Sequence, residues 1–196
     1  MDTVLFFNVA TEIEEKSGEP TGFPQYHFSF VSYTDIKYKG RDSRHLTDVI
    51  GQLDAVTNVT LIDLPNNKGS VFKSDLFLIL LTGQKIRIRI WNPRSDDLDM
   101  TTIICLPYKP IIVVAGLQVR QYHGCNCINT CSGTRFYVDP DNKEAIEVRA
   151  RFPYNDTVVK LISGDQIDTN YNYSYNYAAR KTVEQLLYMN PLTIKI

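Results

Sequence analysis

The 196-residue chain lacks most of the features that mark an enzyme or a membrane protein. It has only three histidines, which are scattered, and no nucleophile lies at a recognisable spacing from a base. Neither a glycine-rich phosphate loop nor a His-x-Glu metal signature occurs, so we expect no catalysis and no cofactor. No apolar run reaches the length that spans a bilayer, and we therefore expect no membrane association.

The chain is also poor in cysteine, and its N-terminus is unlike a secretory signal. The short apolar patch VLFF is followed by acidic residues, which favours an intracellular protein. With four cysteines in a chain of this size, a disulfide framework is not expected. Three of them lie in CNCINTC, residues 125–131, without a second cysteine pair or a nearby histidine, which favours packing over a zinc site.

Net charge is nearly absent as well, at -1, but the charges are unevenly distributed. Residues 83–135 contain seven Lys and Arg against three Asp, a local surplus of four positive charges, whereas 1–82 and 136–196 are net negative. Local potential steers an anionic ligand better than total charge does. The central segment is therefore the place to look for an anion-binding surface.

What this segment contains first is a strand pattern with one unusual face. In KIRIRIWN, residues 85–92, three isoleucines alternate with other residues at the period of two that is typical of a half-buried strand. The opposite face carries Lys85, Arg87, Arg89 and Trp91, the single tryptophan of the chain. Cations beside a flat ring suit an anionic, flat ligand, although a solvated face of an antiparallel sheet shows the same alternation.

A second strand pattern follows in IIVVAGLQVRQYHG, residues 111–124. The odd-numbered residues of 111–119 are predicted to face the core, and Gln118, Arg120 and Tyr122 to lie on the other side. Two strands that each place a ring beside a cation have the chemistry that holds single-stranded nucleic acid by stacking and charge.

Other segments complete a small β domain. Residues 46–64 form a long strand candidate in which Gly51 marks a bend or bulge, and 76–81 form a buried strand that turns into 85–91 as a hairpin. Residues 126–139 supply a fifth strand with an irregular middle. Upstream, Phe23 to Ile36 alternates aromatic and polar residues, and we expect Tyr26, Phe28 and Phe30 to pack on the barrel.

A helix is expected after the fifth strand, with Asp141 as N-cap and Glu144 completing a capping box. Five strands and one helix without βαβ alternation predict an all-β fold, a five-stranded Greek-key OB-fold barrel with a C-terminal capping helix. An immunoglobulin-like sandwich would need more strands at even spacing.

The domain is expected to span 23–153. A strand or linker remnant, 1–22, precedes it. A low-complexity linker and a short helix, 154–196, follow and include NYNYSYNY and RKTVEQLLYMNP.

With these pieces in place, the chain resembles the large DNA-binding subunit of replication protein A, in particular its divergent plant forms and the second of its OB folds. The resemblance covers about 23–152, and its pieces in chain order are FSFVSYTDI, LTDVIGQL, KIRIRIWN, IIVVAGLQVRQYHG and TRFYVDPDNKEA. One departure is the loop after Trp91, which is acidic rather than helix-forming. The end of the chain resembles the lead-in to a further, zinc-carrying fold that is absent, as in a fragment or a shortened paralogue.

The resemblance implies that Trp91 and Tyr122 stack on bases while Arg87, Arg89 and Arg120 hold phosphates. Lys85 lies on the same predicted face. It also implies a nuclear protein that binds single-stranded DNA in replication, repair or recombination, with other replication protein A subunits or tandem OB folds as partners. Two alternatives stay open: a protein-interaction or scaffold OB domain that has lost DNA binding, and an RNA-binding OB fold.

Overall fold

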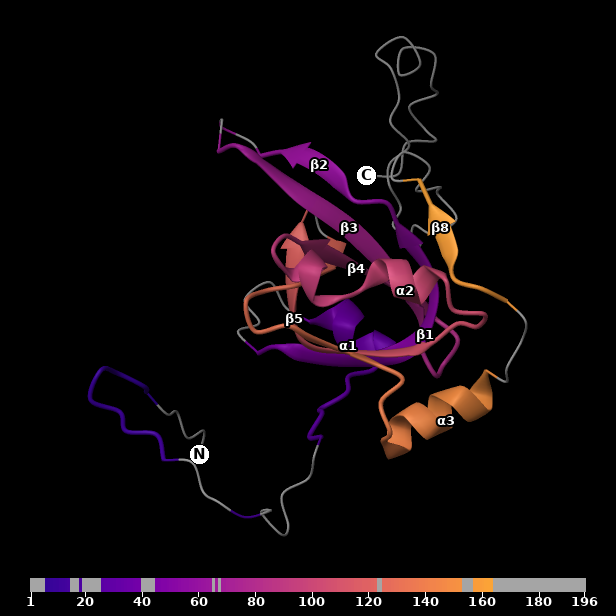
Figure 1. Ribbon diagram of the computed structural model, residues 1–196, viewed down its shortest axis with the longest axis horizontal. Coiled ribbons are helices and arrows are strands. Elements are labelled where there is room, and N and C mark those ends of the chain that lie inside the picture. Colours follow the sequence, from indigo (N-terminus) through magenta and orange to yellow (C-terminus); the bar gives the residue numbers. More distant parts are fainter. Residues whose placement is uncertain are drawn as a thin grey trace, which may run out of the picture.

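The computed structural model describes residues 6–14, 18, 26–39, 45–64, 66, 68–122, 125–152 and 157–163. Within them the chain is mainly β, with short helices between the strands (Figure 1). The strands are β1 Thr47–Thr57, β2 Thr60–Asp63, β3 Ser70–Ile79, β4 Lys85–Trp91, β5 Ile111–Tyr122, β6 Cys125–Asn129, β7 Arg135–Val138 and β8 Lys160–Ile162. The helices are α1 Tyr33–Tyr38, the 3-10 helix η2 Arg94–Asp97, α2 Met100–Ile104 and α3 Lys143–Arg151.

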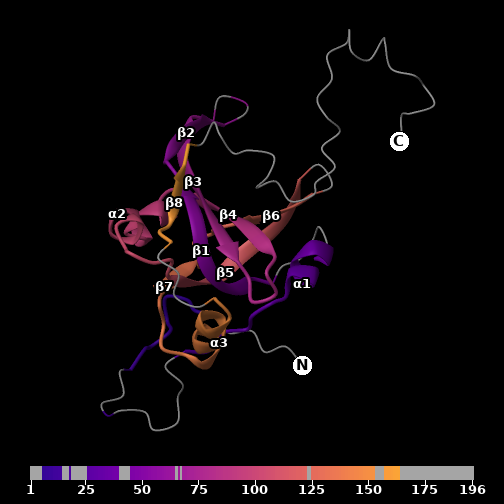
Figure 2. The same cartoon turned by 90° about the vertical axis from the view of Figure 1, so that its right-hand side faces the viewer.

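Five of the strands close into a barrel. β1 pairs antiparallel with both β3 and β5, β3 pairs with β4, β4 runs parallel to β6, and β6 pairs with β5. The resulting circuit, β1-β3-β4-β6-β5 and back to β1, is the Greek-key arrangement of an OB fold and confirms the predicted barrel. The other three strands are not part of this circuit. β2 pairs antiparallel with the first residues of β3, β7 pairs with β5, and β8 runs parallel to β1 (Figures 1 and 2).

β1 serves both halves of the barrel, as predicted for a long strand. Its residues 47–52 pair with β5 and 52–56 with β3. Gly51 lies at a close approach of β1 to β3, because a Cβ there would be 2.6 Å from the carbonyl oxygen of Ile79. The irregularities of register fall on either side of Gly51, so this glycine marks a close approach rather than the bulge itself.

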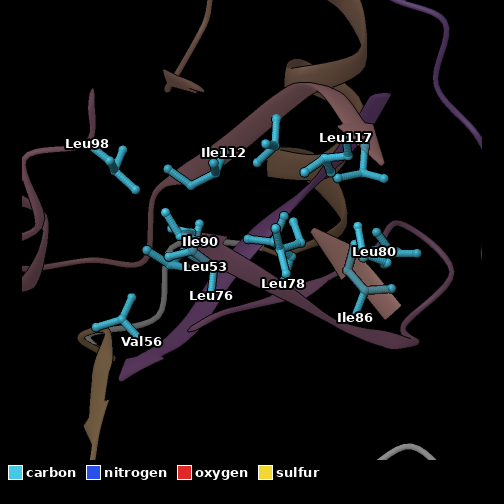
Figure 3. Close-up of a cluster of buried hydrophobic side chains, with 14 of the residues drawn as sticks. Leu53, Val56, Leu76, Leu78, Leu80, Ile86, Ile90, Leu98, Ile112 and Leu117 are labelled. Atoms are coloured by element: carbon cyan, nitrogen blue, oxygen red, sulfur yellow. The ribbon is translucent and has the colours of Figure 1, made fainter. Parts of the chain in front are cut away.

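Apolar side chains from all five barrel strands fill the interior (Figure 3). The isoleucines of β4 enter this core, as their spacing predicted, and the middle of β3 is buried on both faces. The fully buried members include Leu53, Val56, Leu76, Leu78, Ile86, Ile88, Ile90, Ile112, Val114 and Leu117.

The predicted core face of β5 is correct only after Gly116. Leu117 and Val119 do face the core, but before the glycine it is Ile112 and Val114 that enter it. The odd-numbered Ile111 packs in a separate cluster with α3. The prediction that odd-numbered residues face the barrel core therefore fails over residues 111–115, although Ile111 and Val113 are buried outside that core.

A bulge at Gly116 causes this change of face. Its φ is +73°, and its N–H donates to the Asp48 carboxylate at 2.9 Å. The register between β1 and β5 shifts at this point, because Thr47 pairs with Leu117 but Val49 pairs with Val114. An extra residue in one strand reverses its alternation, and a left-handed glycine permits it.

The predicted fifth strand is in fact two. β6 lies between β4 and β5 and pairs with residues 118–122 of β5, whereas β7 pairs with the earlier residues 112–115 of β5. A tight turn separates them, in which the N–H of Thr134 donates to the carbonyl of Cys131 at 3.1 Å. This turn is the irregular middle that the sequence indicated.

Helices cover the barrel differently from the prediction. α3 is present, but its N-cap is Asn142 rather than Asp141, since the Asn142 side chain accepts from the N–H of Ala145 at 3.2 Å. α3 packs against Ile111, outside the main core. The barrel core is instead contacted by α2, which lies on the opposite side of the strands from α1 (Figure 2).

The loop after Trp91 was wrongly expected not to form helix. The Asp99 carboxylate caps α2 by accepting from the N–H and hydroxyl of Thr102, at 3.0 and 2.6 Å, and these hydrogen bonds lower the pKa of Asp99. Leu98 and Ile103 then pack into the core. An acidic residue is a good N-cap, so the acidic character of this loop favours the helix.

The aromatic segment before β1 packs as expected. Tyr26 stacks on Phe28 with ring centroids 5.6 Å apart, and Phe28 contacts both Phe30 and Tyr137 at 5.3 and 5.2 Å. The linker NYNYSYNY and the helix predicted beyond it lie outside the described residues. Among the described helices none is long and apolar enough to cross a membrane.

Replacing Gly116 with alanine should destabilise the fold more than the same change at Gly83. Both glycines have positive φ, +73° and +87°, so alanine at either position costs roughly 1–2 kcal/mol of backbone strain. At Gly116 the new Cβ would also be 2.8 Å from the carbonyl oxygen of Gly133, whereas Gly83 has nothing within 4 Å. Urea unfolding should show an extra loss of at least about 1 kcal/mol for Gly116→Ala. Equal losses would contradict the bulge described here.

Candidate nucleic-acid interface

The outer face of the barrel across β3, β4, β6 and β5 collects the predicted site residues. Residues paired across neighbouring strands share a face of the sheet, so the register fixes the rows of side chains. β4 and β5, predicted as the two strands of a platform, are not neighbours, because β6 lies between them (Figure 2). One complete row runs Asp75, Arg89, Asn129 and Gln118, and the flanking pairs are Lys73 with Trp91, Phe77 with Arg87, and Arg120 with Cys127.

Trp91, which is partly exposed at the end of β4, is held at two points by the end of β6. Its backbone N–H donates to the hydroxyl of the buried Thr130 at 3.0 Å, and its indole Nε1–H donates to Oδ1 of Asn129 at 3.1 Å. The N–H of Thr130 in turn donates to the carbonyl of Arg89 at 2.9 Å. The ring is therefore anchored by its edge.

Tyr122 ends β5, where its backbone pairs with Cys125 of β6. The position of its ring lies outside what the structure describes. That Tyr122 shares a face with Gln118 and Arg120 therefore stays a prediction from the alternation of the sequence.

The cations of β4 are less available than their spacing implied, because buried carboxylates hold them. Asp54 of β1, 2% exposed, accepts from Lys85 at 2.7 Å and from Lys109 at 2.5 Å. Burial acts to raise the pKa of Asp54, but the hydrogen bonds and charges of the two lysines outweigh it and the pKa is lowered. Asp54 is thus an anion beneath the face.

Asp75 of β3 plays the same part for a second pair of cations. Its Oδ2 lies 2.8 Å from Nη2 of Arg87 and 3.1 Å from Nζ of Lys73. The Arg87 guanidinium also lies over the Phe77 ring, 5.9 Å from its centroid. Burial lowers the pKa of Lys73, and the nearby Arg87 and Arg89 add to this effect, while Asp75 opposes it.

The Asp75 pair is not completely satisfied within the described residues. Oδ1 of Asp75 and Nε of Arg87 are buried there without a hydrogen-bond partner. The charge of Arg87 is therefore paired with a buried acid, in an imperfect geometry, and is not presented to solvent.

Two of the predicted cations, Arg89 and Arg120, have no ion pair with any described residue. Arg120 is exposed, and its Nε donates to Oε1 of Gln118 at 2.8 Å, which directs the guanidinium along the face. Arg89 lies in β4 two residues before Trp91. These two arginines are the cations best placed to meet an anion.

Sequence reasoning missed several residues of this face. Lys73 and Asp75 follow the alternation of β3 and could have been placed by extending the pattern upstream of residue 76. Asp54 gave no signal, because it stands among apolar residues of β1. Asn129 lay in the cysteine segment considered for metal binding; among the described residues no group of three or more metal ligands occurs.

The fold and this face together define the class of protein: an OB-fold domain with an aromatic and basic surface over the strands that correspond to the ligand-binding side of such barrels. Residues 36–139 match the family of the replication protein A OB domain, and the chain belongs to that family.

Individual relatives of the chain are also subunits of replication protein A. The chain is 23% identical over 193 residues to a 70 kDa DNA-binding subunit of replication protein A from Arabidopsis thaliana, covering 98% of the chain and 31% of that protein. It is 25% identical over 159 residues to the 70 kDa DNA-binding subunit of Xenopus laevis, covering 81% and 24%. The chain thus spans about a quarter to a third of the length of these relatives.

Among solved structures, a replication protein A heterotrimer bound to ssDNA superposes with a TM-score of 0.57 at 23% identity, covering 74% of this chain and 32% of that chain. At this identity the likeness establishes the OB fold.

Replacing Asp54 with asparagine should destabilise the protein at neutral pH and much less in acid. A carboxylate whose folded pKa is lowered adds stability above its ordinary pKa of about 4, and this stability is lost as the pH falls through the folded value. Removing it leaves Lys85 and Lys109 facing each other, at a cost of roughly 3 kcal/mol at pH 7. Urea unfolding should show a smaller difference in the free energy of unfolding between Asp54→Asn and the unaltered chain at pH 3 than at pH 7. A gap independent of pH would refute the charged role of Asp54.

Proposed function

We propose that this domain binds single-stranded DNA, without catalysis, by stacking bases on Trp91 and neutralising phosphates with Arg89 and Arg120. The observation that carries the proposal is the arrangement of Trp91: a ring anchored by its edge at a strand end, two residues along β4 from an arginine without an acidic partner among the described residues. Tyr122, which the alternation of β5 predicts on the same face as Arg120, is the second proposed stacking residue.

The anchoring of Trp91 favours stacking over base-edge recognition. Indole has a single donor, and in Trp91 that donor already bonds to Asn129. The ligand therefore meets the ring face, which accepts any base, rather than a hydrogen-bonding group that selects one. Binding that tolerates sequence is the expected behaviour.

These two arginines lie on either side of β6, about two strand spacings or roughly 10 Å apart across the sheet. A single strand that crosses β4, β6 and β5 would meet both. Lys85 and Arg87, which are paired with Asp54 and Asp75, contribute less than their position in the sequence suggests.

The family supports the wider setting of this proposal. Its named relatives are DNA-binding subunits several times longer than this chain, so we propose that the domain over 23–153 acts beside further OB folds or other replication protein A subunits. We further propose a nuclear role in replication, repair or recombination. A single OB fold binds weakly, and linked folds raise the overall affinity.

Trp91→Ala should weaken binding to oligo-dT, oligo-dC and oligo-dA alike, by about 1–3 kcal/mol, the usual contribution of one stacked base. Fluorescence anisotropy of labelled oligonucleotides measures this. Phe72→Ala is the control, because Phe72 is an exposed ring of β3 on the opposite face from Trp91. A loss confined to one base, or an equal loss for Phe72→Ala, would contradict the stacking role.

The salt dependence of binding should reveal how many arginines contact phosphates. Each phosphate neutralised on a single strand steepens the plot of log affinity against log salt by about 0.7, so Arg89 and Arg120 together predict a slope of about -1.4. Arg89→Ala and Arg120→Ala should each reduce it by about 0.7, and Lys85→Ala by clearly less. A slope near -2.8 would mean that two further cations, Lys85 and Arg87, also reach phosphates despite their pairing with Asp54 and Asp75. Absence of binding even at low salt would favour a protein-interaction domain instead.

A further inference from the structure

We propose that Asn129 is a positioning residue, which fixes the orientation of the Trp91 ring and thereby prepares it for stacking. The inference rests on the proposed function, because it assigns a residue that acts through Trp91 rather than on DNA directly. Neither the sequence pattern nor the family match indicates this role of Asn129. The evidence is the set of hydrogen bonds at the end of β6.

The Asn129 side chain can make its contacts in one orientation only. Its Oδ1 accepts from Nε1–H of Trp91 at 3.1 Å, and its Nδ2 donates to the carbonyl oxygen of Cys127 at 3.1 Å. Indole N–H can only donate and a backbone carbonyl can only accept, so an exchange of the amide oxygen and nitrogen would lose both bonds. The backbone of β6 therefore determines where the acceptor for the indole lies.

This contact matters because Nε1 is the single polar atom of the indole, and Asn129 is its hydrogen-bond partner. Trp91 ends β4, its side chain is partly exposed, and its cross-strand neighbour Lys73 is engaged with Asp75. Thr130 secures the backbone of Trp91 but not the torsions of its side chain. A partly exposed side chain at a strand end has several staggered rotamers open to it, and a hydrogen bond at the ring edge favours one of them before the ligand arrives.

The role of Asn129 can be tested against a matched control in the same row of the sheet. In its row it lies between Arg89 and Gln118, and Gln118 carries the same amide group but hydrogen-bonds Arg120 instead of Trp91. Gln118→Leu is therefore a matched control for Asn129→Leu. Trp91→Phe keeps an aromatic face but removes the indole donor, so it provides the background in which the proposed contact cannot exist.

The test is a double-mutant cycle on the full chain, with oligo-dT affinity measured by anisotropy. A neutral hydrogen bond changes an equilibrium roughly two- to tenfold, so Asn129→Leu should weaken binding about fivefold when residue 91 is Trp and less than twofold when it is Phe. Gln118→Leu should have the same effect in both backgrounds. Equal losses for Asn129→Leu in both, or no loss in either, would overturn the inference while leaving the stacking role of Trp91 intact.

A readout without DNA guards against a variant that merely disturbs the fold. The chain has one tryptophan, so its NMR spectrum contains one indole N–H signal. Exchange of this proton with water should be slow in the unaltered chain and fastest in Asn129→Leu. It should be intermediate in Asn129→Asp, which retains an acceptor oxygen but loses the donor to the Cys127 carbonyl. Acceleration in Asn129→Asp equal to that in Asn129→Leu would overturn the proposed contact. Failure of the unaltered chain to bind oligo-dT would overturn the proposed function, and this inference with it.

Discussion

The parallel pairing of β4 with β6 is the contact on which the rest of the structure depends. It closes the barrel, since without it β4 and β6 would be open edges on either side of a gap. The same contact brings Asn129 and Thr130 beside Trp91 and places Arg89 in one cross-strand row with Asn129 and Gln118. Closure of the fold and assembly of the candidate surface are thus one event, and the ring is positioned by the strand that completes the barrel.

Buried carboxylates set the electrostatics of this surface. Asp54 and Asp75 are buried and hold two cations each, so three of the seven positive residues between 83 and 135 are paired with buried acids: Lys85, Arg87 and Lys109. Buried charges need such pairing, because an isolated ion in the interior carries a large desolvation penalty. Arg89 and Arg120 remain for an anionic ligand, and Arg89 lies two residues from Trp91 along β4, which fits the proposed surface where stacking contributes much of the affinity.

Much of the fold could be predicted because alternation and turn residues encode it locally. The isoleucines of β4 entered the core as their spacing required, and the barrel followed from the number and order of strands. The prediction failed where a non-local contact decides the outcome. The bulge at Gly116 depends on Asp48, sixty-eight residues away, and it reverses the face of β5. Asn129 likewise has no local signal, because its role exists only once β6 lies beside β4.

The most direct test of the account is the intrinsic fluorescence of the full chain during titration with oligo-dT at low salt. Because Trp91 is the single tryptophan, the signal reports on the proposed stacking ring alone. The account predicts saturable quenching, with a midpoint equal to that of binding measured by anisotropy and with similar amplitude for oligo-dC. Binding detected by anisotropy without any change in tryptophan fluorescence would show that the strand passes elsewhere on the protein, and would contradict the central role of Trp91.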